Sequence, residues 1–201
     1  MFARTERLLL RPGFIEDAPA LAEAIGDEGI VRNLARAPWP YGEAEAHTFL
    51  TMERPELYPD FIILQRTAGK PRLIGGVGFA PAQDGTTEFG YWIARPHWGL
   101  GFASEAGRAA LAVSRALGLG RITAAHFVDN PASGAVLRKL GFRATGRIVQ
   151  RNSVARACNV SAVEYRLPEG TDDGDTEPQM GKRCPIGPDE DIRQQLRLIA
   201  A

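Results

Sequence analysis

EFGYWIARPHWGLGFASE, residues 88–105, is the stretch of this chain that decides its fold. Its first part, residues 88–94, has the aromatic and β-branched composition of a strand, and the part from Ser104 onward has the periodicity of a helix. Gly99 and Gly101 lie in the turn between them. A glycine-containing loop between a strand end and a helix N-terminus favours phosphate groups, because backbone N–H groups point outward and the helix dipole attracts anions. The sequence therefore predicts a phosphate-bearing ligand at this turn.

Composition limits the class of protein. The chain has 201 residues, 44% of them hydrophobic, which is enough for one well-covered core. Apolar runs such as residues 61–64 are too short to span a bilayer. The opening MFARTERLLLRP lacks the long apolar stretch of a secretory signal, so we expect a cytoplasmic protein. The two cysteines and three histidines lack metal-ligand spacing, so neither a disulfide framework nor a bound metal is predicted.

The net charge of zero hides an uneven distribution. The first 167 residues carry 20 basic and 16 acidic side chains, and the remaining residues carry 4 and 8. This excess of positive charge is too small for a nucleic-acid-binding protein, and no membrane partner is expected either. Residues 138–156 contain six basic and no acidic side chains. They suit either a compact polyanion or an ordinary solvated basic face.

The order of the elements predicts a mixed α/β fold. A strand, a crossover helix and a second strand at residues 86–94, 104–117 and 121–128 imply a parallel pair within an otherwise antiparallel sheet. We expect about seven strands, flanked by helices. The other strands are expected at residues 8–10, 61–66, 73–80, 148–151 and 160–167, and the other helices after Asp17, at residues 43–52 and between Asn130 and Gly141.

The composition changes after Leu167. Residues 168–187 contain almost no core-forming side chains and are predicted to be a disordered acidic linker. Residues 188–201 could form a short amphipathic helix that docks on the domain or on a partner.

Two motifs carry a resemblance to a known family. HWGLGFASEA at residues 97–106 and NPASGAVLRKLGF at residues 130–142 resemble the acetyl-CoA-binding core of the GCN5-related N-acetyltransferases, the GNAT family. The TERLLLRP opening and the EFGYWI strand resemble the branch that includes the ribosomal-protein N-terminal alanine acetyltransferases. The resemblance covers residues 5–167. It implies one acetyltransferase domain with a splayed sheet, in which the pantetheine of acetyl-CoA lies between residues 86–94 and 121–128.

The resemblance also implies a set of cofactor contacts. The pyrophosphate of coenzyme A would lie over the turn after His97, where the two glycines allow close backbone approach. Backbone groups of the preceding strand would meet the pantetheine and the thioester, one of them as an oxyanion donor. The sequence departs from the family at Pro96 and Leu100, which puts cofactor affinity in question. The implied cofactor residues are Trp92, Ile93, Ala94, Trp98, Gly99, Leu100, Gly101, Phe102, Ala103, Ser104, Asn130, Ser133 and Leu137.

Several residues of this region have alternative interpretations. Judged from the residues alone, residues 91–93 are ordinary sheet core. Asn130 is a helix N-cap on the same grounds, because Pro131 follows it at the first helical position. Ser133 is either a tolerated small residue or a proton donor to the leaving thiolate, the role that the resemblance implies.

An amine acceptor must lose a proton before it attacks a thioester, which requires a base within hydrogen-bond reach. Glu88 at the start of the cofactor strand is the candidate, and an exposed strand-end glutamate is the alternative. Arg36, Trp39 and Tyr41 would border the acceptor, with Glu88, although Trp39 and its following proline could simply pack the domain. Cys158 is a poor candidate for an acyl carrier because no histidine is near it in the sequence.

The sequence therefore predicts an acetyl-CoA-dependent N-acetyltransferase. The acceptor would be a protein N-terminal α-amine or a small-molecule amine, attacked directly in a ternary complex by a monomer or a homodimer. One alternative is a non-catalytic acyl-CoA-binding sensor. Another is a nucleotide-binding protein, which the absence of a GxxxxGK[ST] motif disfavours.

Overall fold

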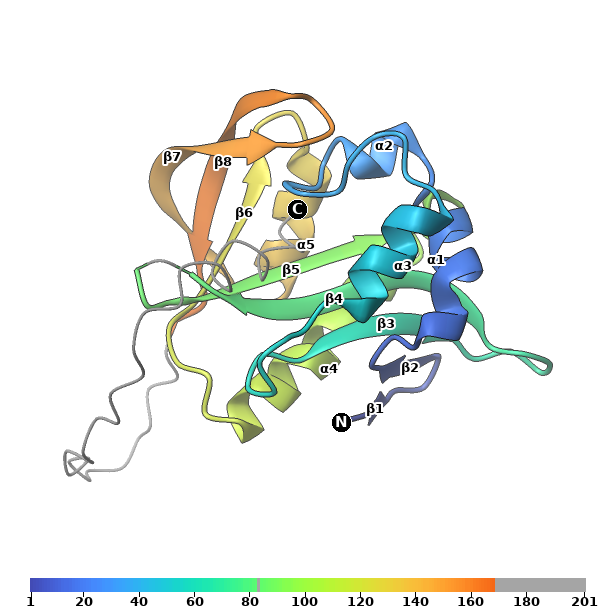
Figure 1. Cartoon of the computed structure of the whole chain (residues 1–201). Coiled ribbons are helices and arrows are strands. Elements are labelled where there is room, and N and C mark those ends of the chain that lie inside the picture. The colour runs from blue at the N-terminus through green and yellow to red at the C-terminus, as the bar shows by residue number, and fades with distance from the viewer. Residues whose placement is uncertain (83, 169–201) are drawn as a thin grey trace.

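The computed structural model describes residues 1–82 and 84–168 (Figure 1). The linker predicted for residues 168–187, apart from Pro168, and the helix predicted for residues 188–201 lie outside the described residues. The strands are β1 (Ala3–Arg4), β2 (Leu8–Arg11), β3 (Asp60–Gln65), β4 (Arg72–Pro81), β5 (Thr87–Ile93), β6 (Ile122–Phe127), β7 (Arg143–Ser153) and β8 (Cys158–Arg166). The helices are α1 (Ala18–Ile25), α2 (Glu28–Val31), α3 (Glu43–Thr51), α4 (Phe102–Ala116) and α5 (Pro131–Lys139), with short 3₁₀ turns η1 (Ile15–Asp17) and η2 (Arg95–His97).

The strands form one sheet in the order β1-β2-β3-β4-β5-β6-β8-β7. Every neighbouring pair is antiparallel except β5 and β6, which are parallel. This confirms the predicted mixed α/β fold with one parallel pair. The described sheet has eight strands rather than about seven, because the two-residue β1 was too short to predict.

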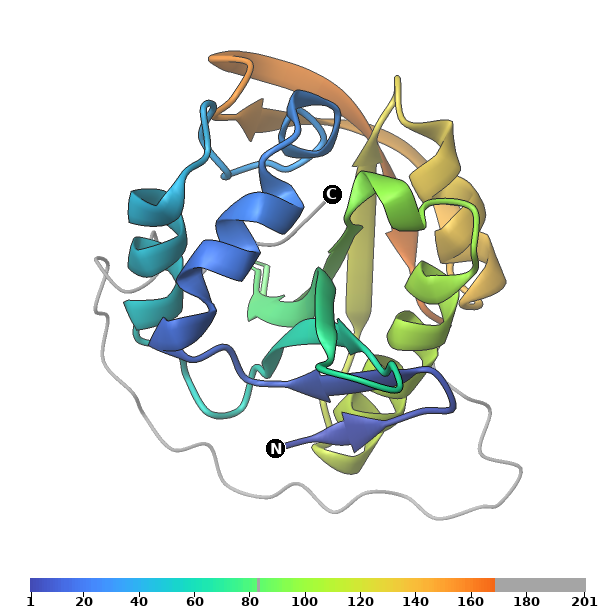
Figure 2. The same ribbon diagram turned by 90° about the vertical axis from the view of Figure 1, so that its right-hand side faces the viewer.

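The helices cover both faces of the sheet (Figures 1 and 2). On one face α4 packs on a core that includes Phe89 and Tyr91, and on the other α1, α2 and α3 pack on a core that includes Trp92. Because side chains alternate along a strand, β5 presents Glu88 to the same face as Trp92. The side chains on the two faces of β5 therefore pack into two different hydrophobic cores.

β5 and β6 separate soon after they meet. They pair only at Thr87 with Ile122 and at Glu88 with Thr123. Beyond that point β6 pairs with β8 alone, and the backbone of β5 up to Ile93 has no neighbouring strand on the β6 side. This confirms the splayed sheet that the family resemblance implied, and it leaves an open strand edge at the centre of the molecule.

Local signals set the ends of the two helices beside this opening. Gly101 is the N-cap of α4 and has a left-handed backbone with φ of +80°. Asn130 caps α5 by accepting a hydrogen bond from the Ser133 N–H at 3.4 Å. Gly141 follows α5 with φ of +92°, and the N–H of Phe142 returns to Leu137 O at 3.0 Å. These findings confirm the predicted cap at Asn130 and the predicted end of this helix before Gly141.

Two elements were missed or underestimated. α2 is a single turn, capped by the Asp27 side chain on the Gly29 N–H. β7 is eleven residues long but was predicted only at residues 148–151, because most of its side chains are exposed and do not alternate.

The peptide bond between Trp39 and Pro40 is cis. In the part of the chain that the structure describes, no helix is both long enough and apolar enough to cross a bilayer.

A carboxyl group at the start of β3 makes stability depend on pH. Burial raises the pKa of Asp60 from 3.8 to about 6. The positive charge of Arg54, whose Nε lies 3.0 Å from Asp60 Oδ2, lowers this pKa but does not outweigh the burial. The folded protein therefore binds this proton more tightly than the unfolded chain does. We expect the free energy of unfolding to fall by up to about 2–3 kcal/mol as the pH rises from about 4 to 6.

Asp60→Asn is expected to remove this part of the pH dependence, because it leaves no proton to bind at this position. Urea denaturation of both proteins at intervals between pH 4 and pH 7 checks the prediction. Equal pH dependence in the two proteins would contradict it.

Candidate functional site

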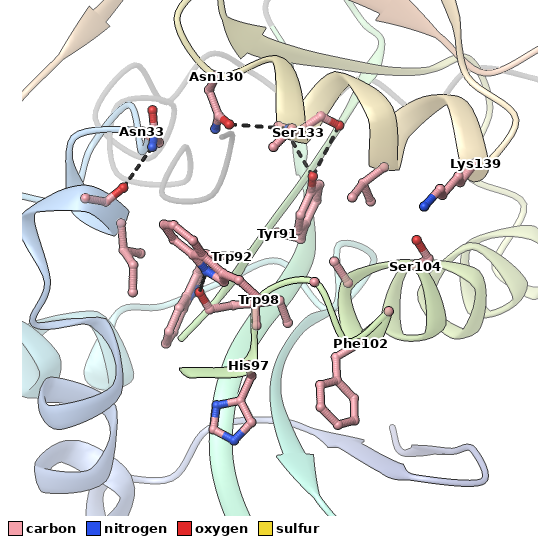
Figure 3. A pocket seen from close by; sticks show the side chains of 18 of the residues that line it. Asn33, Tyr91, Trp92, His97, Trp98, Phe102, Ser104, Asn130, Ser133 and Lys139 are labelled. Atoms are coloured by element: carbon pink, nitrogen blue, oxygen red, sulfur yellow. Dashed lines mark hydrogen bonds between the residues drawn. The ribbon is translucent and has the colours of Figure 1, made fainter. Parts of the chain in front are cut away.

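A pocket of about 270 Å³ lies where β5 and β6 part. Its walls come from α2 and the turn after it, the end of β5, the loop into α4, and α5 (Figure 3). The pocket brings together most of the cofactor residues implied by the resemblance: Trp92, Ile93, Trp98, Gly99, Gly101, Phe102, Ala103, Ser104, Asn130 and Ser133.

The N-terminus of α4 opens into this pocket without a side-chain cap. The first N–H groups of an α-helix have no partner within the helix, so those of α4 are free for an anion. Gly99 and Gly101 have φ of +74° and +80°, and no atom lies within 4 Å of the position that a Gly99 Cβ would take. The left-handed backbone therefore favours glycine at both positions, and the open space at Gly99 leaves room for a ligand to approach the backbone there.

The hydroxyl of Tyr91 reaches across the pocket to Ser133 (Figure 3). It donates a hydrogen bond to Ser133 Oγ at 2.9 Å. Burial raises the pKa of Tyr91 to about 12, although the hydrogen bond with Ser133 opposes this. Tyr91 therefore stays protonated near neutral pH and occupies an acceptor position on Ser133, which leaves the Ser133 hydroxyl proton to point elsewhere. Sequence reasoning treated the Tyr91 side chain as sheet core and missed this pair.

Some of the backbone groups at the end of β5 already have hydrogen-bond partners within the protein. Thr87 donates its N–H to Arg121 O on the β6 side, so by alternation Tyr91 and Ile93 turn their backbone groups to that side too. The Ile93 carbonyl accepts a hydrogen bond from Trp98 Nε1 at 2.6 Å. The Ala94 N–H donates to Ile74 O on β4 at 2.8 Å and is therefore not directed at the pocket.

Three implied cofactor residues do not line the pocket. Ala94 is buried against the helices of the other face, and Leu137 is 1% exposed within the core under α4. Leu100 is 54% exposed and is not among the lining residues, and its carbonyl accepts a hydrogen bond from Arg7. Val136 and Lys139 of α5 line the pocket as well, and neither was among the implied cofactor residues.

Glu88 lies in a second, smaller cavity. Its residue exposure is 4%, so the alternative of an exposed strand-end glutamate is wrong. Ala35, Phe127 and Arg151 help to line this cavity, and Arg151 Nη1 lies 2.7 Å from Glu88 Oε1. The cavity volume of about 10 Å³ suffices for about one water molecule. Glu88 and Ser133 are therefore not brought into one pocket, and their joint role stays a prediction.

The predicted acceptor-side residues are placed differently. Tyr41 is buried in the core under α1, and burial raises the pKa of its hydroxyl. Trp39 is 43% exposed, and neither it nor Arg36 lines either cavity. Asn33, Leu34 and residues of α2 line the larger pocket instead. Because α2 was not predicted as an element, the sequence pointed to the neighbouring connection.

Charged and titratable groups complete the pocket. Lys139 on α5 faces Ser104 on α4 across one end (Figure 3). His97 lines another part, and its pKa is lowered by burial and by the charge of Arg72. His97 is therefore neutral at physiological pH. Among the described residues, no group of three His, Cys, Asp or Glu side chains could hold a metal ion.

Several basic residues of the 138–156 segment are already paired. Arg138 donates to Tyr165 Oη at 3.0 Å, Arg151 pairs with Glu88, and Arg156 Nη1 lies 2.8 Å from Asp129 Oδ2. Arg156 also donates to Arg32 O at 2.7 Å, which ties the turn between β7 and β8 to the end of α2. These contacts favour internal pairing over a polyanion site for this segment.

Comparison with known proteins identifies the family. The model of the acetyltransferase (GNAT) domain matches residues 7–143. YoaA of Bacillus subtilis, an uncharacterized N-acetyltransferase, is 34% identical over 152 residues, which make up 73% of this chain and 85% of YoaA.

Solved structures share the fold. A GNAT-family acetyltransferase from Bacillus anthracis matches with a TM-score of 0.69 and 24% identity, over 83% of this chain and 98% of that chain. RimL, a ribosomal L7/L12 α-N-protein acetyltransferase in complex with coenzyme A, matches with a TM-score of 0.68 and 18% identity, over 83% and 97% of the two chains. The splayed sheet, the family-model match and the similarity to YoaA lead to one conclusion: the chain belongs to the GNAT family and is an acetyltransferase.

Proposed function

We propose that this protein transfers the acetyl group of acetyl-CoA to a primary amine, which attacks the thioester directly in a ternary complex. The observation that carries the proposal is the pocket between β5 and β6, which joins an open strand edge to the uncapped N-terminus of α4. Coenzyme A combines an amide-bearing arm with a pyrophosphate. The strand edge suits the amides, and the helix terminus suits the phosphates.

In this proposal residues of α5 and β5 act on the thioester group of acetyl-CoA. Ser133 would donate its hydroxyl proton to the departing thiolate, and Tyr91 would hold Ser133 in position through their 2.9 Å hydrogen bond. The Ile93 N–H would stabilise the oxyanion that develops on the thioester carbonyl. Asn130 caps α5 and lines the same pocket, so capping and a pantetheine contact are compatible roles for it.

Glu88 would accept the proton of the acceptor ammonium, directly or through one water molecule. Its burial and its place on the Trp92 face of β5 support a position on the acceptor side, opposite the α4 compartment. The acceptor would enter beside Asn33 and the α2 turn, which form the pocket wall on that side. A protein N-terminal α-amine and a small-molecule amine both remain within this proposal, and RimL, which matches in fold, is a protein α-N-acetyltransferase.

A panel of amines tested with acetyl-CoA, with released thiol as the readout, tests the proposal. The panel should include peptides with free N-termini, polyamines and aminoglycosides. We expect thiol release with at least one primary amine. Binding of CoA without thiol release from any amine would favour an acyl-CoA sensor and overturn the proposed reaction.

Ser133→Ala is expected to lower kcat by about tenfold to a hundredfold at pH 7, because the leaving thiolate loses its proton donor. The KM for acetyl-CoA should change less. The defect should shrink near pH 9, since a thiol with a pKa of about 8.5 leaves readily as the thiolate. Steady-state kinetics across this range, with Ser161→Ala on β8 as the control, checks the prediction. A defect that does not change with pH would contradict the proton-donor role.

A further inference from the structure

The TERLLLRP opening of the chain meets the loop that leads into α4. Glu105, in the first turn of α4, is contacted by two residues of this opening. Thr5 Oγ1 donates to Glu105 Oε1 at 2.5 Å, and the Arg7 backbone N–H donates to the same oxygen at 3.1 Å. Arg7 Nε donates to Glu105 Oε2 at 2.7 Å. Two motifs almost one hundred residues apart therefore share one hydrogen-bonded cluster.

Arg7 also holds the loop itself. Its Nη1 donates to the Leu100 carbonyl at 3.1 Å, and its guanidinium lies over the Phe102 ring, 4.4 Å from the ring centre. Its Nη2 would be 3.7 Å from a Cβ at Gly101. One side chain from outside the loop thus contacts Leu100 and Phe102, the two residues that flank Gly101 at the start of α4.

The charge of Glu105 makes this cluster important for an anion. Burial alone would raise the pKa of Glu105, but hydrogen bonds from Thr5 and Arg7 and the charge of Arg7 together lower it. Glu105 is therefore a carboxylate at neutral pH, within one turn of the helix end that would receive phosphates. An unpaired carboxylate there would repel a phosphate, and residues 98–101 of the loop carry no basic side chain of their own.

We propose that Arg7 is a positioning residue for phosphate binding, which fixes the two residues on either side of the left-handed Gly101 and offsets the charge of Glu105. The inference rests on the proposed acetyl-CoA function. In this proposal the binding of the CoA phosphates depends partly on Arg7, a residue of the β1–β2 turn that is remote from the glycine loop in the sequence.

Isothermal titration calorimetry with CoA, and NMR titration with pantetheine, which carries no phosphate, test the proposal. Arg7→Gln should weaken CoA binding by about fivefold to tenfold, the size expected for a charge near a helix N-terminus. Pantetheine binding should stay within about twofold, because no phosphate is present to sense the change. Arg4→Gln removes an exposed charge from the same hairpin and should leave CoA affinity unchanged.

The double variant Arg7→Gln/Glu105→Gln isolates the charge effect. It should recover most of the CoA affinity lost in Arg7→Gln, and Arg7→Lys should lose less affinity than Arg7→Gln. Unchanged CoA affinity in Arg7→Gln, or an equal loss for pantetheine, would overturn the proposal. If the unaltered protein binds no CoA, the proposed function itself fails, and this result is distinct from the failure of the Arg7 inference.

Discussion

Glu88→Gln is expected to lower kcat by about 10²- to 10⁴-fold at pH 7, the range typical of a lost general base. The acceptor ammonium would have to lose its proton to bulk solvent before it attacks. CoA affinity should change little, because Glu88 lines the small cavity beside Arg151 and not the pocket at the α4 N-terminus. Kinetics with the best amine of the panel, together with calorimetry for CoA, would separate the two effects.

The pH profile makes this test specific. Activity of Glu88→Gln should rise with pH toward that of the unaltered protein, because a free α-amine, with a pKa of about 8, forms without a base at higher pH. Glu56→Gln, which alters an exposed glutamate before β3, should have no effect on kcat. A deficit in Glu88→Gln that persists unchanged up to pH 9.5 would assign Glu88 a structural role with Arg151.

Features that depend on neighbours in the sequence were predictable. Asn130 and Pro131 indicated the start of α5, and Gly141 its end, because caps and left-handed termini are set by a few consecutive residues. The parallel pair followed from the strand, helix and strand order around α4. The two-residue β1 and the single turn of α2 carry too few residues for a periodic signal, so they were missed.

Contacts between distant segments could not be predicted. Tyr91 and Ser133 are 42 positions apart, and their hydrogen bond depends on how far α5 lies from β5. Alternation along β5 places Glu88 on the Trp92 face, but its pairing with Arg151 depends on the path of the exposed β7. The sequence therefore indicated which strand and which helices form the site, while the partners of each polar side chain required the structure.

Phe89→Ala is expected to lower the free energy of unfolding by about 3–5 kcal/mol, because it removes a large, fully buried aromatic ring. Phe89 is 1% exposed, and its ring lies among those of Phe79, Tyr91 and Phe142, with centre-to-centre distances of 5.5, 6.0 and 5.5 Å. Truncation would leave a cavity between β4, β5 and Phe142, the residue directly before β7. Rigid rings and strand backbone can close such a cavity only in part.

Urea denaturation, with thermal unfolding as a second measurement, checks this prediction. A domain of this size should lose roughly 10 °C in Tm, since each kcal/mol corresponds to about 2–4 °C. Phe89→Leu should cost less than half as much, because it retains most of the apolar volume. Ile148→Ala on β7 removes a side chain that is 66% exposed and should change stability by less than about 0.5 kcal/mol. A loss below about 1 kcal/mol for Phe89→Ala would mean that the aromatic cluster does not hold α4 and α5 against the sheet.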